Sequence, residues 1–180
     1  MRNKIRLLQR IHSSRRKLER CIFYFQRGAE GKLEISVRLK YSEEEMTAPG
    51  VVGNWSLKDI LGNISACEQR FIQACQPPIG TDRGASLMVM GMQSYLPGLF
   101  GSSPQLSLAA TLEKFLTSHR EVLVLIQNLE PEALFASRRL TAIGSPLLVE
   151  EAADATYRNY DRAREQIRQW QRGRIGRERF

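Results

Sequence analysis

Imidazole and thiol groups, the usual ligands of transition metals, are few in this sequence. His12 and His119 are its only histidines, so three histidines of one chain cannot form a metal site. His119 lies on an apolar stripe of a predicted helix, which leaves two interpretations: a buried neutral imidazole with one hydrogen bond, or a group with a chemical role. No Gly-x-Ser-x-Gly elbow, phosphate-binding loop, paired-carboxylate motif or Cys/His dyad is present.

The three cysteines, Cys21, Cys67 and Cys75, are odd in number and lack CxxC spacing. This pattern indicates buried or free thiols in a reducing compartment, and we expect a cytoplasmic protein. No segment reaches the roughly 18 uncharged apolar residues that a membrane-spanning helix needs. The basic N-terminus lacks the apolar core and cleavage site of a secretory signal.

Length and composition predict one globular domain over residues 1–180, with an apolar fraction of 42%. The net charge of +8 is uneven, since residues 1–40 carry a net of +9. We therefore divide the domain into a basic N-terminal helix and extension (1–40), a core (41–171) and a basic tail (172–180). The basic segments either attract nucleic acid, anionic lipid or an acidic partner, or form a solvated helix face and a frayed tail.

A loop that turns into a helix is the clearest local signal. Pro49, Gly50 and Gly53 interrupt the chain, and Ser56 followed by Asp59 forms the pattern of a capping box. Trp55 precedes the cap and could pack on Ile60 as a hydrophobic staple. This start predicts a helix from Leu57 to about Gln76, where two prolines end it.

Apolar periodicity predicts the other helices. They cover residues 2–26, about 107–129, 131–136 and about 148–171. The last helix has an unbroken seam of alternating four- and three-residue steps: Val149, Ala153, Thr156, Tyr160, Ala163, Ile167 and Trp170.

Two segments do not fit this helical pattern. Residues 33–40 alternate between apolar and polar side chains, which predicts a short strand, and its partner strand could come from another subunit. Residues 77–106 form a long, Gly- and Met-rich connection, which either packs in a core or interface or forms a pocket wall or lid.

Three stretches resemble the DinB-like four-helix bundles, and most closely their ClbS/DfsB branch. The string Gly-x-Trp-Ser-x-Lys-Asp-Ile-Leu-x-x-Ile, which ends at Ile64, is similar to the second-helix signature. Residues 118–135 are similar to the third helix and its turn, and residues 154–170 to the fourth helix. The resemblance implies an all-α, up-down-down-up bundle. Residues 28–40 and 77–106 match nothing in the family, so the short N-terminal β segment and the long connection between helices 2 and 3 are predicted from the sequence pattern alone.

The sequence departs from the family at the metal ligands. The resemblance places Asn63, Asn159 and Ala163 where metal-binding relatives have histidines. Asn is a poor ligand for zinc or nickel and Ala is none, so we expect no metal and no other cofactor.

The same resemblance places Asn63 and Asn159 at the cavity of the bundle. Together with Tyr160 they could form a polar cluster for a small ligand, or they could bond only to each other. Glu68, one turn beyond Asn63, could be a base if it faced the cavity, but a solvent-facing position is favoured. Asn63, Glu68, His119, Asn159 and Tyr160 are therefore the candidate ligand-binding residues, and no catalytic residue is assigned.

These expectations lead to two hypotheses on function. In the first, the chain is a metal-independent bundle that binds a reactive small molecule. It then either only binds this molecule or acts on it as a hydrolase or resistance protein. In the second, it is a non-enzymatic, dimerising interaction protein whose basic segments bind an anionic partner. We expect a homodimer, and only weak, salt-sensitive association with DNA.

Overall fold

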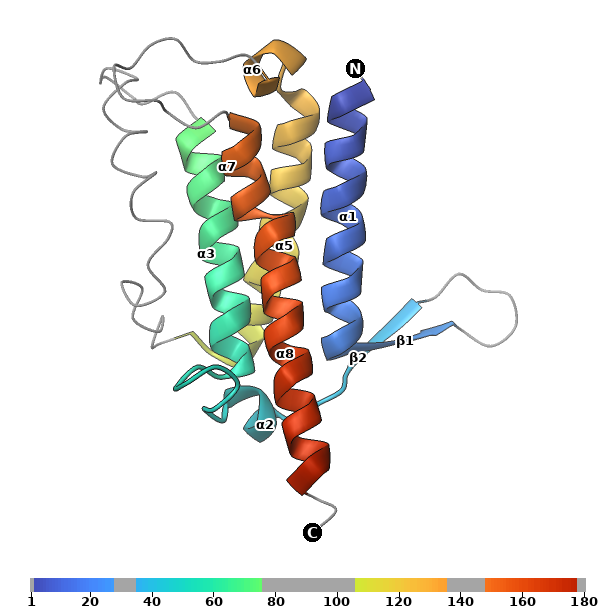
Figure 1. The fold of residues 1–180 in the computed structure, drawn as a ribbon, viewed down its shortest axis with the longest axis vertical. Helices are drawn as coiled ribbons and strands as arrows, with labels where there is room; N and C mark the ends of the chain where they lie inside the picture. The colour runs from blue at the N-terminus through green and yellow to red at the C-terminus, as the bar shows by residue number, and fades with distance from the viewer. Residues whose placement is uncertain (1, 28–34, 76–105, 136–147, 178–180) are drawn as a thin grey trace.

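The computed structural model describes residues 2–27, 35–75, 106–135 and 148–177, which form a helical bundle with a small sheet at one end (Figure 1). The long helices are α1 (Arg2–Ile22), α3 (Leu57–Cys75), α5 (Leu108–Asn128) and α8 (Tyr157–Arg177). Shorter helices are α2 (Glu43–Thr47), α6 (Pro131–Phe135) and α7 (Leu148–Ala155), and the strands are β1 (Phe23–Arg27) and β2 (Ile35–Leu39). The prediction of a mostly helical protein is confirmed.

The directions of the long helices follow from Figure 1. Helix α1 descends, α3 and α5 both ascend, and α7 and α8 return downward. Helix α3 packs mainly on α5, and α1 mainly on α8. This is the order of directions that the family resemblance implies, while membership of the DinB-like superfamily stays a prediction.

The start of α3 agrees with the predicted loop and cap. Gly50 and Gly53 both have positive φ, which glycine adopts without strain. The Ser56 amide donates to Asp59 Oδ2 at 2.9 Å, and the Asp59 amide donates to Ser56 Oγ at 3.1 Å, so the capping box is confirmed. Trp55 is half-buried against the core, and its pairing with Ile60 stays a prediction.

The first helix is shorter than the predicted range 2–26. It ends at Ile22, and Phe23–Arg27 form a strand. This strand pairs antiparallel with Ile35–Leu39, so the strand predicted from residues 33–40 has its partner within the same chain. Aromatic residues favour a pleated, half-buried surface, and the pairing satisfies their backbone groups. Residues 28–34 lie outside the described ranges.

The predicted last helix is divided in two near its start. Helix α7 ends at Ala155, and α8 begins at Tyr157 and continues to Arg177, into the segment expected to be a basic tail. The Thr156 hydroxyl donates to the Ala152 carbonyl, and such back-bonding competes with the helical ladder. The predicted seam is nevertheless retained, because its central members are buried: Ala153, Thr156, Tyr160, Ala163 and Ile167.

The helices at 108–128 and 131–135 match their predictions within one residue at each end. Helix α2 was not predicted, although Ser42 and Glu45 form a second capping box that marks its start. The predicted connection 77–106 lies almost wholly outside the described ranges.

Among the helices of the described ranges, none combines the length and the apolar character that a membrane-spanning helix requires.

Candidate functional site

A layer of polar side chains crosses the interior of the bundle, and every long helix contributes to it. Its members are Arg15 from α1, Glu68 from α3, Ser118 and His119 from α5, and Tyr160 from α8, and all five are buried. We call these residues the polar layer. Burying so many polar groups is costly unless they satisfy one another, so their hydrogen bonds decide what the layer can do.

Glu68 is the centre of the polar layer and has no exposed surface. Its carboxylate accepts hydrogen bonds from the Ser118 hydroxyl and the Tyr160 hydroxyl. The Arg15 Nη1 atom lies 3.8 Å from Glu68 Oε1 and supplies a compensating positive charge. The favoured expectation of a solvent-facing Glu68 was therefore wrong: the residue continues the apolar stripe through Ile64 and Phe71.

Arg15 is buried in the middle of α1. Its guanidinium donates from Nη2 to the Phe115 carbonyl at 2.6 Å and from Nε to Glu19 at 2.8 Å. It also lies 3.2 Å from the centre of the Phe115 ring, within the range of a cation–π interaction. Nη1 has no hydrogen-bond partner among the described residues, so its contribution to Glu68 is electrostatic.

Tyr160 must donate its only proton to Glu68, because a carboxylate can only accept. Burial raises the pKa of Tyr160 well above its ordinary value, and the negative charge of Glu68 raises it further. The hydroxyl therefore stays protonated across the physiological range. Its oxygen still has lone pairs, which can accept a hydrogen bond from a neighbour.

His119 is that neighbour. Its Nδ1 lies 3.1 Å from the Tyr160 oxygen and 3.7 Å from Glu68 Oε1. Since the Tyr160 proton is directed at Glu68, Nδ1 must carry the proton of this contact, and in a neutral imidazole Nε2 is then the acceptor. Nε2 has no hydrogen-bond partner within the described ranges, and His119 keeps 9% of its surface exposed. The layer thus holds a histidine whose Nε2 has no hydrogen-bond partner among the described residues.

The two asparagines predicted at the cavity lie apart from this hydrogen-bond chain. Asn159 is buried, and its Nδ2 finds no acceptor in the part of the chain that the structure describes. Asn63 is only half-buried, and no hydrogen bond joins it to Asn159 among the described contacts. The structure therefore brings together Glu68, His119 and Tyr160 of the predicted residues, with Asn159 adjacent to Tyr160 in sequence. Sequence reasoning missed Arg15 and Ser118.

Two other kinds of chemistry receive no support at this layer. Burial raises the pKa of the Cys67 thiol, which disfavours the thiolate that a cysteine nucleophile requires. Across the described ranges, no group of three or more His, Cys, Asp or Glu side chains is placed to hold a metal ion.

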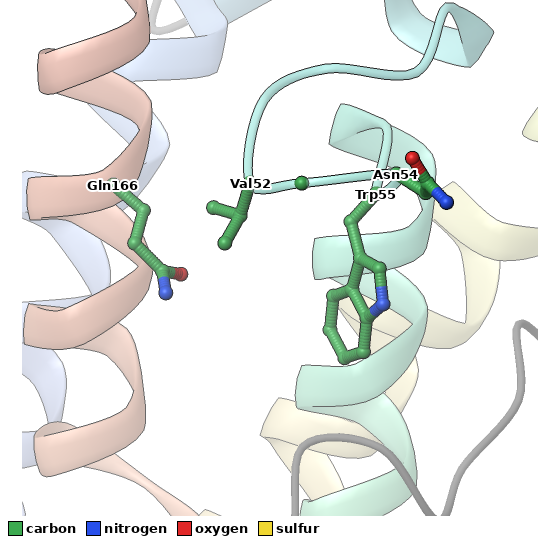
Figure 2. Close-up of a pocket in the computed structure, with 5 residues that line it drawn as sticks. Val52, Asn54, Trp55 and Gln166 are labelled. Carbon is green, nitrogen blue, oxygen red and sulfur yellow. The ribbon is translucent and has the colours of Figure 1, made fainter.

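A shallow pocket lies elsewhere, between the turn that precedes α3 and the middle of α8. Figure 2 shows Val52, Asn54 and Trp55 on one side of it and Gln166 of α8 on the other. Its lining is mostly apolar, and it contains none of the predicted site residues. The pocket therefore offers surface for apolar contact but no acid, base or nucleophile.

Comparison with protein-family models, with curated proteins and with solved structures finds no match to this chain. The interpretation of the site consequently depends on its own geometry.

Proposed function

We propose that this chain is a metal-independent, small-molecule-binding bundle of the DinB-like ClbS/DfsB type, and that His119 acts as the base in hydrolysis of a reactive ligand. The observation that carries the proposal is the hydrogen-bonded chain from Glu68 through Tyr160 to His119. It fixes the imidazole tautomer and leaves Nε2 as a proton acceptor at the edge of the buried layer.

The proposed step is general-base catalysis. A water molecule gives a proton to His119 Nε2 while its oxygen bonds to an electrophilic carbon of the ligand. The imidazolium that forms is stabilised by the Glu68 carboxylate, 3.7 Å from Nδ1. The bond between the electrophilic carbon and the leaving group then breaks, and the imidazolium gives its proton to the departing group, so no net charge remains on the protein.

Asn159 supports the binding part of the proposal. A buried amide that finds no acceptor among the described residues is unusual, and we propose that a carbonyl or hydroxyl of the ligand accepts its hydrogen bond. Asn63, half-buried on α3, is proposed to contact the outer part of the ligand.

Hydrolysis of an activated ester, p-nitrophenyl acetate, tests the proposal with a control inside the chain. His119→Gln should abolish protein-dependent hydrolysis, while His12→Gln, which changes the exposed histidine of α1, should retain it. Addition of a chelator should change neither rate, because no metal takes part. Equal activity of the wild type and His119→Gln would contradict the proposed base.

The burial of Glu68, Ser118 and Tyr160 favours one alternative, a polar layer that only specifies how the helices pack in a non-enzymatic interaction protein. In that case both histidine variants would behave alike in the ester assay. Ligand screens by thermal shift would also find no compound whose stabilising effect is lost in Asn159→Leu.

A further inference from the structure

The β1–β2 hairpin has two different faces, and it projects from the bundle where α1 ends (Figure 1). In its antiparallel register, Phe23 is opposite Leu39 and Tyr24 is opposite Arg38. Side chains of a strand alternate, so Phe23, Phe25 and Leu39 share an apolar face, and Tyr24 and Arg38 share the other. Phe23 is buried, whereas the Tyr24 side chain is 53% exposed.

Two basic residues share the face of the hairpin that carries Tyr24. Lys40 Nζ lies 5.1 Å from the centre of the Tyr24 ring and is held there by a 2.6 Å hydrogen bond to the Arg20 carbonyl. Arg38, directly across the hairpin, is exposed. The ring is therefore a surface aromatic with one fixed cation, Lys40, beside it and an exposed arginine opposite it on the paired strand.

We name the surface formed by Tyr24, Arg38 and Lys40 the hairpin junction. Its members come from the two paired strands and from the residue that follows β2.

We propose that the hairpin junction binds single-stranded nucleic acid. An exposed ring can stack on an unpaired base of any identity, and the flanking cations can contact the phosphates on either side of that base. The basic N-terminal 40 residues, with a net charge of +9, extend the attraction beyond the junction. A duplex offers the same phosphates, but its bases are stacked on one another and cannot stack on Tyr24. A loss of affinity on removal of the Tyr24 ring therefore distinguishes binding of single strands by stacking from attraction by charge alone.

The test measures fluorescence anisotropy of a labelled single-stranded oligothymidylate of about 20 nucleotides, at salt concentrations from about 50 to 200 mM. Tyr24→Ala should weaken binding about tenfold or more at each salt concentration, since stacking is lost but charge is not. Arg38→Ala should weaken binding and reduce the salt slope by about 0.7. Arg120→Ala, an exposed charge change on α5, is the matched control and should have little effect on either quantity.

Three results would overturn the proposal. The first is unchanged affinity of Tyr24→Ala, with circular dichroism showing an intact fold. The second is equal loss of affinity in Arg38→Ala and Arg120→Ala, which indicates attraction without a site. The third is binding to phosphatidylserine vesicles with the same dependence on Tyr24 and no binding of the oligonucleotide, which identifies a lipid surface instead.

Discussion

At the scale of single residues, Glu68 and Arg15 depend on each other, because each is a charged group removed from water. Glu68→Leu should lower the free energy of unfolding by about 3–5 kcal/mol, since it leaves the buried Arg15 guanidinium with Glu19 as its remaining carboxylate and removes the acceptor of the Ser118 and Tyr160 hydroxyls. Adding Arg15→Met should recover part of that loss, because the buried guanidinium is then gone. Urea denaturation of the two variants and the wild type measures both effects. If the double variant is no more stable than Glu68→Leu, the two charges are not coupled.

Asn159 differs from Glu68 and Arg15, because its buried Nδ2 lacks a hydrogen-bond partner among the described residues and so lowers the stability of the folded state. Asn159→Leu should raise the free energy of unfolding by about 1 kcal/mol, since an unsatisfied buried donor is removed without much change in volume. The same change at half-buried Asn63 removes no such donor and should be close to neutral. Lower stability of Asn159→Leu would mean that the amide has a structural partner.

The residues of the polar layer show what sequence could predict at this scale. His119 and Tyr160 lie on helical stripes, so their burial follows from spacing. Glu68 lies on a stripe too, but whether a carboxylate is buried depends on compensating groups brought by other helices. Those groups, Arg15 and Ser118, are separated from Glu68 by about 50 residues each way, and no local pattern links them.

At the scale of elements, the helix starts should depend measurably on their caps. Ser56→Ala removes the acceptor of the Asp59 amide and a hydroxyl that donates to Asp59 Oδ2 at 2.7 Å, so it should cost about 1–2 kcal/mol. Ser107→Ala removes one cap contact, to the Ala110 amide, and should cost about 1 kcal/mol or less. Thermal melts of both variants measure the difference. A neutral Ser56→Ala would contradict the capping box at α3.

These caps also explain which elements were predictable. The start of α3 and both ends of α5 are set by residues within one turn of the boundary, so local sequence was sufficient. The end of α1 is different, because Phe23–Arg27 become a strand only by pairing with Ile35–Leu39. That choice depends on a partner segment, and periodicity within residues 2–26 could not reveal it.

At the scale of the whole molecule, the raised pKa of Tyr160 links the polar layer to stability at alkaline pH. The folded protein retains the phenolic proton to a higher pH than the unfolded chain does. The stabilisation is therefore complete below the ordinary tyrosine pKa, near 10, and is lost as the pH rises above it. Urea midpoints measured from pH 8 to about 11 should fall above pH 10, and by less in Tyr160→Phe, which has no proton to lose.

Long-range proton–nitrogen NMR of the two imidazoles tests directly whether Glu68 and Tyr160 fix the proton of His119 on Nδ1. At about pH 8, where a free imidazole is neutral, His119 should show a protonated Nδ1 and an unprotonated Nε2. Exposed His12 provides an internal reference without a buried partner. A His119 spectrum with the proton on Nε2 would contradict the proposed role, because Nε2 would then have no lone pair with which to accept a proton from water.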